Sequence, residues 1–130
     1  MDSKEIDILR GEGHIMKKYC ISKDYTIKEA IESIERFHNR VVVVVDDYEK
    51  VLGIVSQGDV IRALIEGKNL YSHVQTIIRP NFFYLNNRDI EAAYRLFRKH
   101  QITLLPIVDN EFHLVDVISM NDIYDYMEEK

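Results

Sequence analysis

The chain has 130 residues, of which 46% are hydrophobic and 30% are charged, the composition of a globular domain that can bury a moderate core. Its formal net charge of −5 is scattered along the sequence without a basic cluster, which argues against nucleic acid as a partner. No apolar segment reaches the roughly 20 residues that cross a bilayer, and the charged N-terminus lacks the apolar stretch of a signal peptide, so we expect a cytoplasmic protein without a membrane partner.

The first predicted helix covers residues 26–38. Apolar residues recur there at helical spacing, and Thr26 with Glu29 has the pattern of a capping box at the helix start. Five consecutive valines at residues 41–45 come next and are followed by Asp46. This run predicts a buried strand that ends in a turn, because β-branched residues favour strands.

A second strand is predicted over residues 51–55, close enough to the first to form a hairpin, and a helix over residues 57–66 follows it. We expect residues 15–67 to form one repeat and residues 68–80, a short apolar-periodic segment that ends at a proline, to form a connector. Residues 1–14 fit neither repeat and are interpreted as an N-terminal extension.

The remaining chain, residues 81–130, repeats this order. A helix is predicted over residues 89–100 with Asp89 as its N-cap, strands over residues 104–108 and 114–118, and a closing helix over residues 120–128.

The two halves are related by a constant offset of 63 residues. Ser56 and Asp59 correspond in this way to Ser119 and Asp122, and six identities accompany the repeated order of chemical types. One such β-α-β-β-α unit is too small to cover its own sheet and helices. We therefore expect an α+β fold in which two repeats pack together with pseudo-two-fold symmetry.

The repeated pattern resembles the cystathionine β-synthase (CBS) domain pair, also called the Bateman module, over about residues 15–128. The resemblance is carried by Gly53-Ile-Val-Ser56-Gln-Gly-Asp59 and by Leu105-Pro106-Ile107-Val108-Asp109. The stretch SQGDVIRALIEGKNL, residues 56–70, is similar to CBS pairs attached to sugar-phosphate nucleotidyltransferases and sugar-phosphate isomerases.

The repeated Ser-x-x-Asp has two physical interpretations. Each copy lies where a strand passes into a helix, so free amide groups and the helix dipole can attract a phosphate, while the carboxylate can accept hydrogen bonds from ribose hydroxyls. The same spacing also fits a capping box that serves the helix alone. The residues by themselves leave both interpretations open.

The resemblance implies two clefts, each combining residues of both repeats. Cleft A would hold Ser56, Asp59, Phe82, Phe83, Tyr84, Ile102 and Thr103, with Arg62 as a weaker candidate. Cleft B would hold Ser119, Asp122, Tyr19, Cys20, Ile21, Asn39 and Arg40, with Arg40 placed to pair with a phosphate. Asp116 stands where the first repeat has Gly53, and we expect its carboxylate to repel a phosphate, so the clefts are expected to be unequal.

The resemblance implies a regulatory sensor that binds an adenine-type nucleotide, AMP, ADP, ATP or S-adenosylmethionine, and modulates an attached or partner enzyme. The resemblance also implies a homodimer. The alternative is a dimerisation and interaction scaffold that binds no small molecule. We expect no catalytic activity, because no nucleophile stands beside a base. No cysteine and histidine group has zinc spacing, so no metal site is expected.

Overall fold

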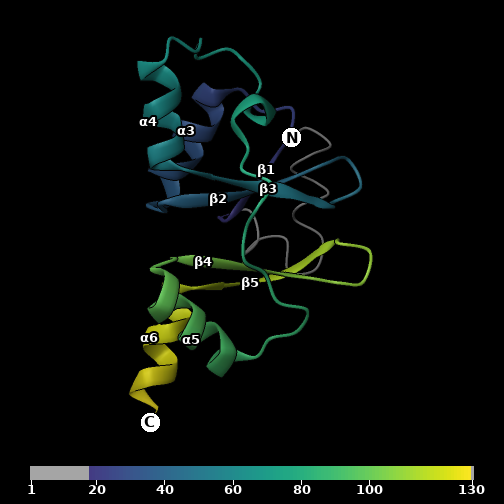
Figure 1. The fold of residues 1–130 in the computed structure, drawn as a ribbon, viewed down its shortest axis with the longest axis vertical. Helices are drawn as coiled ribbons and strands as arrows, with labels where there is room; N and C mark the ends of the chain where they lie inside the picture. The colour runs from purple at the N-terminus through teal and green to yellow at the C-terminus, as the bar shows by residue number, and fades with distance from the viewer. Residues whose placement is uncertain (1–17, 130) are drawn as a thin grey trace. The chain divides into compact units, whose positions relative to one another are not determined.

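The computed structural model describes residues 18–129, which form two compact units that divide after Phe82 (Figure 1). Residues 18–82 are called unit 1 and residues 83–129 unit 2. Each unit contains an antiparallel hairpin between two helices, so the predicted α+β fold with two repeats of β-α-β-β-α type is confirmed. The predicted N-terminal extension lies outside the described residues.

Unit 1 is a three-stranded sheet with its helices on one face (Figure 1). The strand order is β1-β2-β3, with β1 parallel and β3 antiparallel to the central strand β2. Its elements are β1 (Cys20–Ser22), α3 (Ile27–Phe37), β2 (Val41–Val45), β3 (Val51–Ser56), α4 (Gln57–Ile65) and the 3₁₀ helix η1 (Val74–Ile77).

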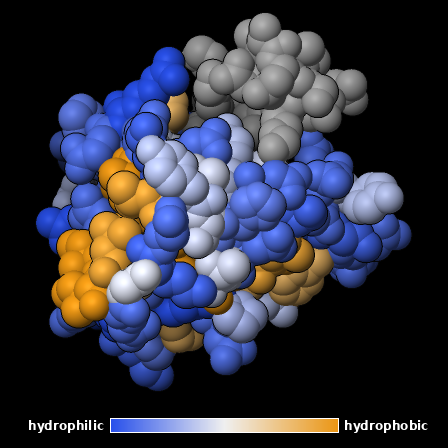
Figure 2. Space-filling view, turned by 90° about the horizontal axis from the view of Figure 1, so that it is seen from above, coloured by the Kyte–Doolittle hydropathy of each residue, from blue (hydrophilic) through white to orange (hydrophobic). Residues whose placement is uncertain are grey.

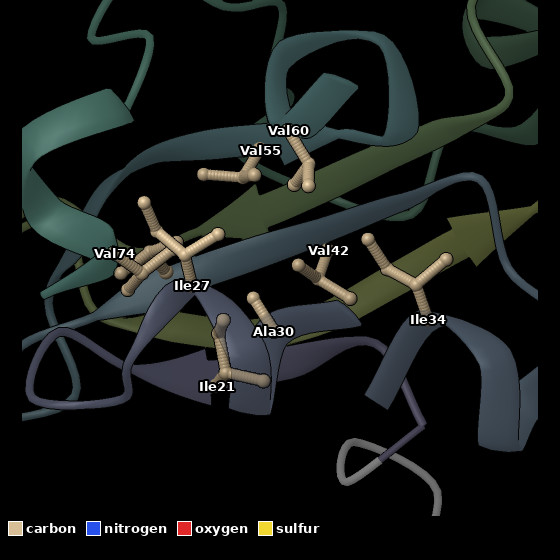
Figure 3. Close-up of a cluster of buried hydrophobic side chains, with 9 residues drawn as sticks. Ile21, Ile27, Ala30, Ile34, Val42, Val55, Val60 and Val74 are labelled. Carbon is tan, nitrogen blue, oxygen red and sulfur yellow. The ribbon is translucent and has the colours of Figure 1, made fainter. Parts of the chain in front are cut away.

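The core of unit 1 lies between the sheet and these helices (Figure 3). Alternate residues of each strand point into it, because successive side chains of a strand face opposite sides. The helix residues are those that recur at the predicted spacing, and the predicted capping box of Thr26 and Glu29 starts α3. The buried set is Ile21, Ile27, Ala30, Ile34, Val42, Val44, Val55, Val60 and Val74.

Unit 2 pairs two strands and covers them with two helices. Its elements are α5 (Ile90–His100), β4 (Leu104–Val108), β5 (Leu114–Ser119) and α6 (Met120–Glu128). Its buried core is Ala93, Phe97, Leu105, Ile107, Ile118 and Ile123. None of the helices within residues 18–129 has the length and apolar character needed to cross a membrane.

The first strand of unit 2 is reduced to a single parallel bridge between Leu85 and Ile107. In unit 1 the equivalent pair is Ile21 with Val44. A constant offset of 63 would place Tyr84 opposite Ile107, so the repeat slips by one residue before the helix.

The repeated acids Asp46 and Asp109 build the two hairpin turns. Asp46 Oδ1 accepts hydrogen bonds from the backbone N–H groups of residues 48 and 50, and Asp109 Oδ1 accepts the corresponding two from residues 111 and 113. Glu49 and Phe112 have φ angles of 65° and 71°, and each hairpin carries a bulge next to its turn. This repeated feature is therefore explained by the turn alone.

Candidate functional site: the two Ser-x-x-Asp motifs

In unit 1 the motif lies at the junction of β3 and α4. Ser56 is the N-cap of α4, and its hydroxyl oxygen accepts a hydrogen bond from the Asp59 backbone N–H at 3.1 Å. The Asp59 carboxylate accepts one in return from the Ser56 backbone N–H at 2.8 Å. The capping box, one of the two interpretations that the sequence leaves open, is therefore present.

Asp59 has a second role besides capping, because two arginines contact the same carboxylate. Arg62, one turn along α4, places Nη2 at 2.9 Å from Oδ1, and Arg79, from the connector, places Nε at 3.0 Å from Oδ2. The Asp59 side chain is only 7% exposed, whereas those of Arg62 and Arg79 are 62% and 53% exposed. A buried acid thus anchors two guanidinium groups that reach solvent.

The connector brings Arg79 to this position by pairing with the edge of β3. The backbone groups of Ile54 and Arg79 exchange two hydrogen bonds, at 3.0 and 3.2 Å. Gly53 makes this approach possible, because a Cβ there would lie 2.3 Å from the Arg79 carbonyl oxygen and 2.3 Å from Ile78 Cγ2. The requirement is space: the positive-φ residues of the described chain do not include Gly53.

The contacts around Asp59 set its protonation. Burial by itself would raise the pKa of this carboxyl, but the hydrogen bonds from Ser56, the hydrogen bond from Arg62 and the charge of Arg79 together outweigh it and lower the pKa. Asp59 is therefore ionised at neutral pH.

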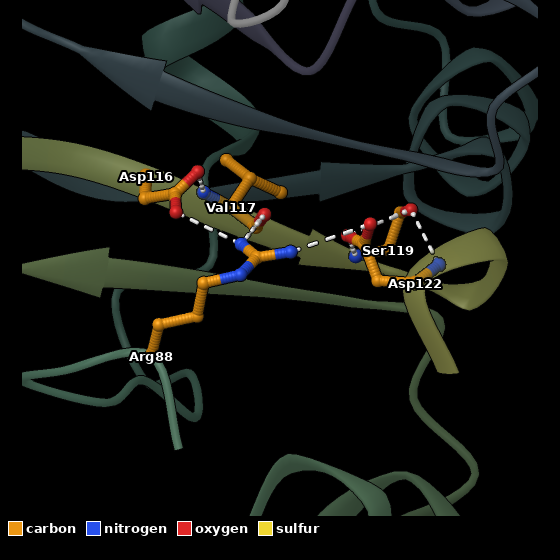
Figure 4. A network of polar contacts seen from close by, with 5 residues as sticks. All are labelled: Arg88, Asp116, Val117, Ser119 and Asp122. Carbon is orange, nitrogen blue, oxygen red and sulfur yellow. Dashed lines mark hydrogen bonds and ion pairs between the residues drawn. The ribbon is translucent and has the colours of Figure 1, made fainter. Parts of the chain in front are cut away.

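Unit 2 repeats the motif at the start of α6 (Figure 4). Asp122 Oδ2 accepts hydrogen bonds from the Ser119 backbone N–H at 2.8 Å and from the Ser119 hydroxyl at 3.2 Å. The Asp122 backbone N–H donates to the Ser119 hydroxyl oxygen at 3.4 Å, which completes a second capping box.

A single arginine serves two carboxylates in unit 2 (Figure 4). Arg88 Nη1 lies 2.8 Å from Asp116 Oδ2 and also donates to the Val117 carbonyl at 3.2 Å, while its Nη2 lies 3.3 Å from Asp122 Oδ1. The Asp116 charge is therefore partly compensated by Arg88, and the expected repulsion of a phosphate is weaker than the sequence suggests.

The two motifs offer different groups to a ligand. Asp59 already accepts three hydrogen bonds of the roughly four that a carboxylate can take, and it is buried. The Asp122 carboxylate also has three polar contacts, two hydrogen bonds from Ser119 and the ion pair with Arg88, but its side chain is 32% exposed, so it is the more accessible to ribose hydroxyls. Unit 1 presents guanidinium groups where unit 2 presents a carboxylate.

Two of the three aromatic residues predicted for cleft A, Phe83 and Tyr84, pack within unit 2. The ring of Phe83 stacks on His100 with centroids 4.2 Å apart, and that of Tyr84 meets Phe112 edge to face at 4.8 Å. Both predicted residues remain about two-fifths exposed. Each predicted cleft takes residues from both units, so the grouping of these side chains with a Ser-x-x-Asp motif stays a prediction.

The other candidates from the sequence lie on strands and turns. Cys20 and Ile21 are buried in β1; the Ile21 side chain belongs to the core, so only its backbone is left for a ligand. Burial and the charge of Glu49 raise the pKa of the Cys20 thiol to about 12. Ile102 and Thr103 are half-buried before β4, and Arg40 is exposed before β2.

Three further cleft candidates have mainly backbone roles or partial burial. The Tyr19 carbonyl accepts a hydrogen bond from the Val43 N–H at 2.7 Å, and the Asn39 side-chain amide donates to the Lys18 carbonyl. Phe82 is half-buried at the end of unit 1. Their proposed contacts with a ligand also stay predictions.

Sequence reasoning missed Arg79 and Arg88. Both lie outside the helices and strands, and each reaches an acid at least 20 positions away, so no local spacing marks them. The one usable signal for Arg79 is Gly53 inside a strand, which indicates a close backbone approach.

Comparison with known proteins assigns the chain to a family. The CBS domain model matches residues 13–66 and 74–129. Arabinose 5-phosphate isomerase GutQ of Salmonella typhi is 31% identical over 101 residues, which are 76% of this chain and 31% of GutQ, so the chain spans about a third of that relative's length.

Solved structures show the same fold. The cytosolic domain of the Mg²⁺ channel MgtE in complex with ATP is 25% identical with a TM-score of 0.66, over 85% of this chain and 45% of the other. A CBS domain protein from Pyrobaculum aerophilum complexed with AMP is 18% identical with a TM-score of 0.68, over 98% and 99% of the two chains. Because the family model matches twice, over most of the chain, this protein belongs to the CBS domain family and is a tandem CBS domain pair.

Proposed function

We propose that this CBS pair is a regulatory module that binds an adenine nucleotide, AMP, ADP or ATP, with S-adenosylmethionine as the other candidate ligand. The observation that carries the proposal is that each unit presents a serine, an ionisable acid and an arginine together at the start of a helix. Relatives of the same fold were solved with AMP and with ATP, which supports a nucleotide as the ligand.

The chemistry of the two motifs suits the parts of a nucleotide. Guanidinium groups and the N–H groups of a helix start bind phosphate oxygens. A carboxylate accepts hydrogen bonds from two vicinal hydroxyls, and the partly exposed Asp122 is the better placed of the two acids to do so. Regulation follows if the ligand binds one arrangement of the two units more tightly than another, since its differential affinity shifts their equilibrium.

The regulated enzyme is proposed to act on sugar phosphates, either on the same polypeptide or as a separate partner. The support is the similarity of residues 56–70 to CBS pairs of sugar-phosphate nucleotidyltransferases and isomerases, and the match to GutQ, whose name is that of a sugar-phosphate isomerase. The CBS pair itself is proposed to be non-catalytic.

Thermal unfolding with added AMP, ADP, ATP or S-adenosylmethionine tests the proposal. A ligand at 100 times its Kd adds about 2.7 kcal/mol to the free energy of unfolding, which raises Tm by several degrees. Asp59→Asn and Asp122→Asn keep a capping oxygen but remove the charge, and at least one of them should abolish the shift. The matched control is Glu29→Gln, which alters the capping box of α3 outside both motifs. No shift with any of the four ligands contradicts the proposal.

A second candidate function is a homodimeric interaction scaffold. Figure 2 shows apolar side chains gathered over one part of the viewed surface, at the side where Figure 1 places α4. Three apolar residues of α4 are exposed, Ile61, Leu64 and Ile65, the last of them 80% exposed. Exposed apolar groups on a helix are typical of protein contacts.

Sedimentation of the wild type and of Ile65→Glu, with Glu66→Gln at the C-cap of the same helix as the control, distinguishes this candidate. A dimer that the Ile65 substitution dissociates, in a protein that shows no thermal shift with any nucleotide, supports a scaffold. If the wild type stays monomeric across the concentration range, the homodimeric scaffold is ruled out.

A further inference from the structure

We propose that Arg62 and Arg79, held on the buried Asp59, form a polyphosphate site within unit 1, and that unit 2 has no equivalent site. The identification of the natural ligand as a nucleotide rests on the function proposed above. The phosphates are placed at the motif of unit 1, and the affinity of this site rises with the number of phosphates in the ligand.

In the described part of the chain, the two guanidinium groups keep most of their hydrogen-bond donors free for a ligand. A guanidinium has five N–H donors in a planar fork. Arg62 uses Nη2 and Arg79 uses Nε for Asp59, and among residues 18–129 neither arginine pairs with a second acid. Most of their donors therefore remain available, and both side chains are more than half exposed, so those donors are accessible to a solute.

The two arginines are preorganised for binding an anion. A flexible arginine loses side-chain freedom when it binds an anion, whereas Arg62 and Arg79 are already fixed by hydrogen bonds to one buried carboxylate. Arg79 is also held in place by the two backbone hydrogen bonds that it exchanges with Ile54. Guanidinium groups arranged in this way bind phosphate oxygens through paired hydrogen bonds.

The net charge of the unit 1 cluster also favours an anion. Among the described residues, the cluster of unit 1 contains one carboxylate and two guanidinium groups, so it carries an excess positive charge that favours an added anion. Each additional phosphate of a ligand adds negative charge within reach of the same two cations. Tripolyphosphate and ATP should therefore bind more tightly than AMP.

Unit 2 has the opposite balance. The position equivalent to Gly53 is Asp116, and the position equivalent to Arg62 is the exposed Asp125. Arg88 is already engaged by two carboxylates and a carbonyl, as Figure 4 shows. This cluster contains more carboxylates than guanidinium groups and disfavours a polyphosphate.

Isothermal titration calorimetry of the full chain with AMP, ADP, ATP and inorganic tripolyphosphate tests the inference. We expect affinity to increase from AMP to ATP, and tripolyphosphate to compete with ATP. Arg62→Gln and Arg79→Gln should each weaken the binding of ATP and tripolyphosphate by about tenfold or more, because a charge-assisted hydrogen bond is lost in each. The control is Arg95→Gln, which removes an equally exposed helix arginine paired with Glu91 and should change nothing.

The outcomes separate this inference from the proposed function. If ATP binds the Arg62→Gln variant and the wild type equally, and Asp122→Asn abolishes binding, the arginine site is wrong and the nucleotide function stands. If tripolyphosphate binds through the arginines but no nucleotide does, the anion site stands and the proposed function fails. If no compound binds, both are overturned. Arg62 lies on an exposed helix surface, so its variant gives a result even if Arg79→Gln unfolds.

Discussion

Gly53→Ala should destabilise unit 1 and displace Arg79 from Asp59. The new methyl group would lie 2.3 Å from the Arg79 carbonyl oxygen, a backbone atom that cannot rotate away. Relief requires the connector to move off β3, which breaks the two backbone hydrogen bonds between Ile54 and Arg79. Each of the two is worth about 1 kcal/mol net, and withdrawal of the half-buried Ile78 from the core costs about 1 kcal/mol more, so we expect a loss of about 3 kcal/mol.

Urea unfolding followed by circular dichroism measures this loss as a lower midpoint at unchanged slope. The control is Gly58→Ala, in the first turn of α4, where a Cβ meets only the Ser56 hydroxyl oxygen at 3.6 Å. That substitution should be neutral or stabilising by up to about 1 kcal/mol, because alanine favours a helix over glycine. If the two variants are equally stable, the close approach of the connector to β3 is not the reason for glycine at position 53.

Three further substitutions follow from the polar contacts. Asp59→Asn should lower the free energy of unfolding by about 1–2 kcal/mol at pH 7. Because the folded-state pKa of Asp59 is lowered, this difference is fully present above the unfolded pKa of about 3.9 and disappears as pH falls through the folded pKa. A difference in urea melts that stays constant down to pH 2 contradicts this explanation. Arg88→Gln should lower the free energy of unfolding by about 1 kcal/mol, and by less at high salt. Adding Asp116→Asn to the same chain should restore part of this loss. If Arg88→Gln is as stable as the wild type, the ion pairs of Arg88 do not stabilise unit 2. Cys20, with a thiol pKa of about 12, should react with a thiol reagent at pH 8 about a thousandfold more slowly in the folded than in the unfolded chain, and rapid labelling of folded protein would place it at the surface.

Local patterns were sufficient to predict most elements. The capping box of Thr26 and Glu29 and the N-cap Asp89 mark the starts of α3 and α5, and the valine run marks β2, within one residue of the observed bounds. These features succeed because the interactions that define them join residues three or four apart, or depend on the residue type itself.

Contacts between distant residues could not be predicted in the same way. The start of unit 2 was expected to follow the constant offset, but the bridge forms at Leu85, because one residue fewer separates it from the following helix than separates Ile21 from α3. Arg79 and Arg88 reach their acids only after the connector and the sheet have formed. Arg79 and Arg88 were therefore absent from the candidate site, whereas Arg62, the other arginine on Asp59, was among the predicted candidates.

A ¹H–¹⁵N NMR titration of the full chain with ATP tests nucleotide binding at the two Ser-x-x-Asp motifs. Binding there predicts that the amide signal of Gly58 or of Asn121, in the first turns of α4 and α6, is among the most strongly shifted, while the amide of Glu29 at the start of α3 stays unchanged. A spectrum in which neither Gly58 nor Asn121 responds to saturating ATP would contradict nucleotide binding at the Ser-x-x-Asp motifs.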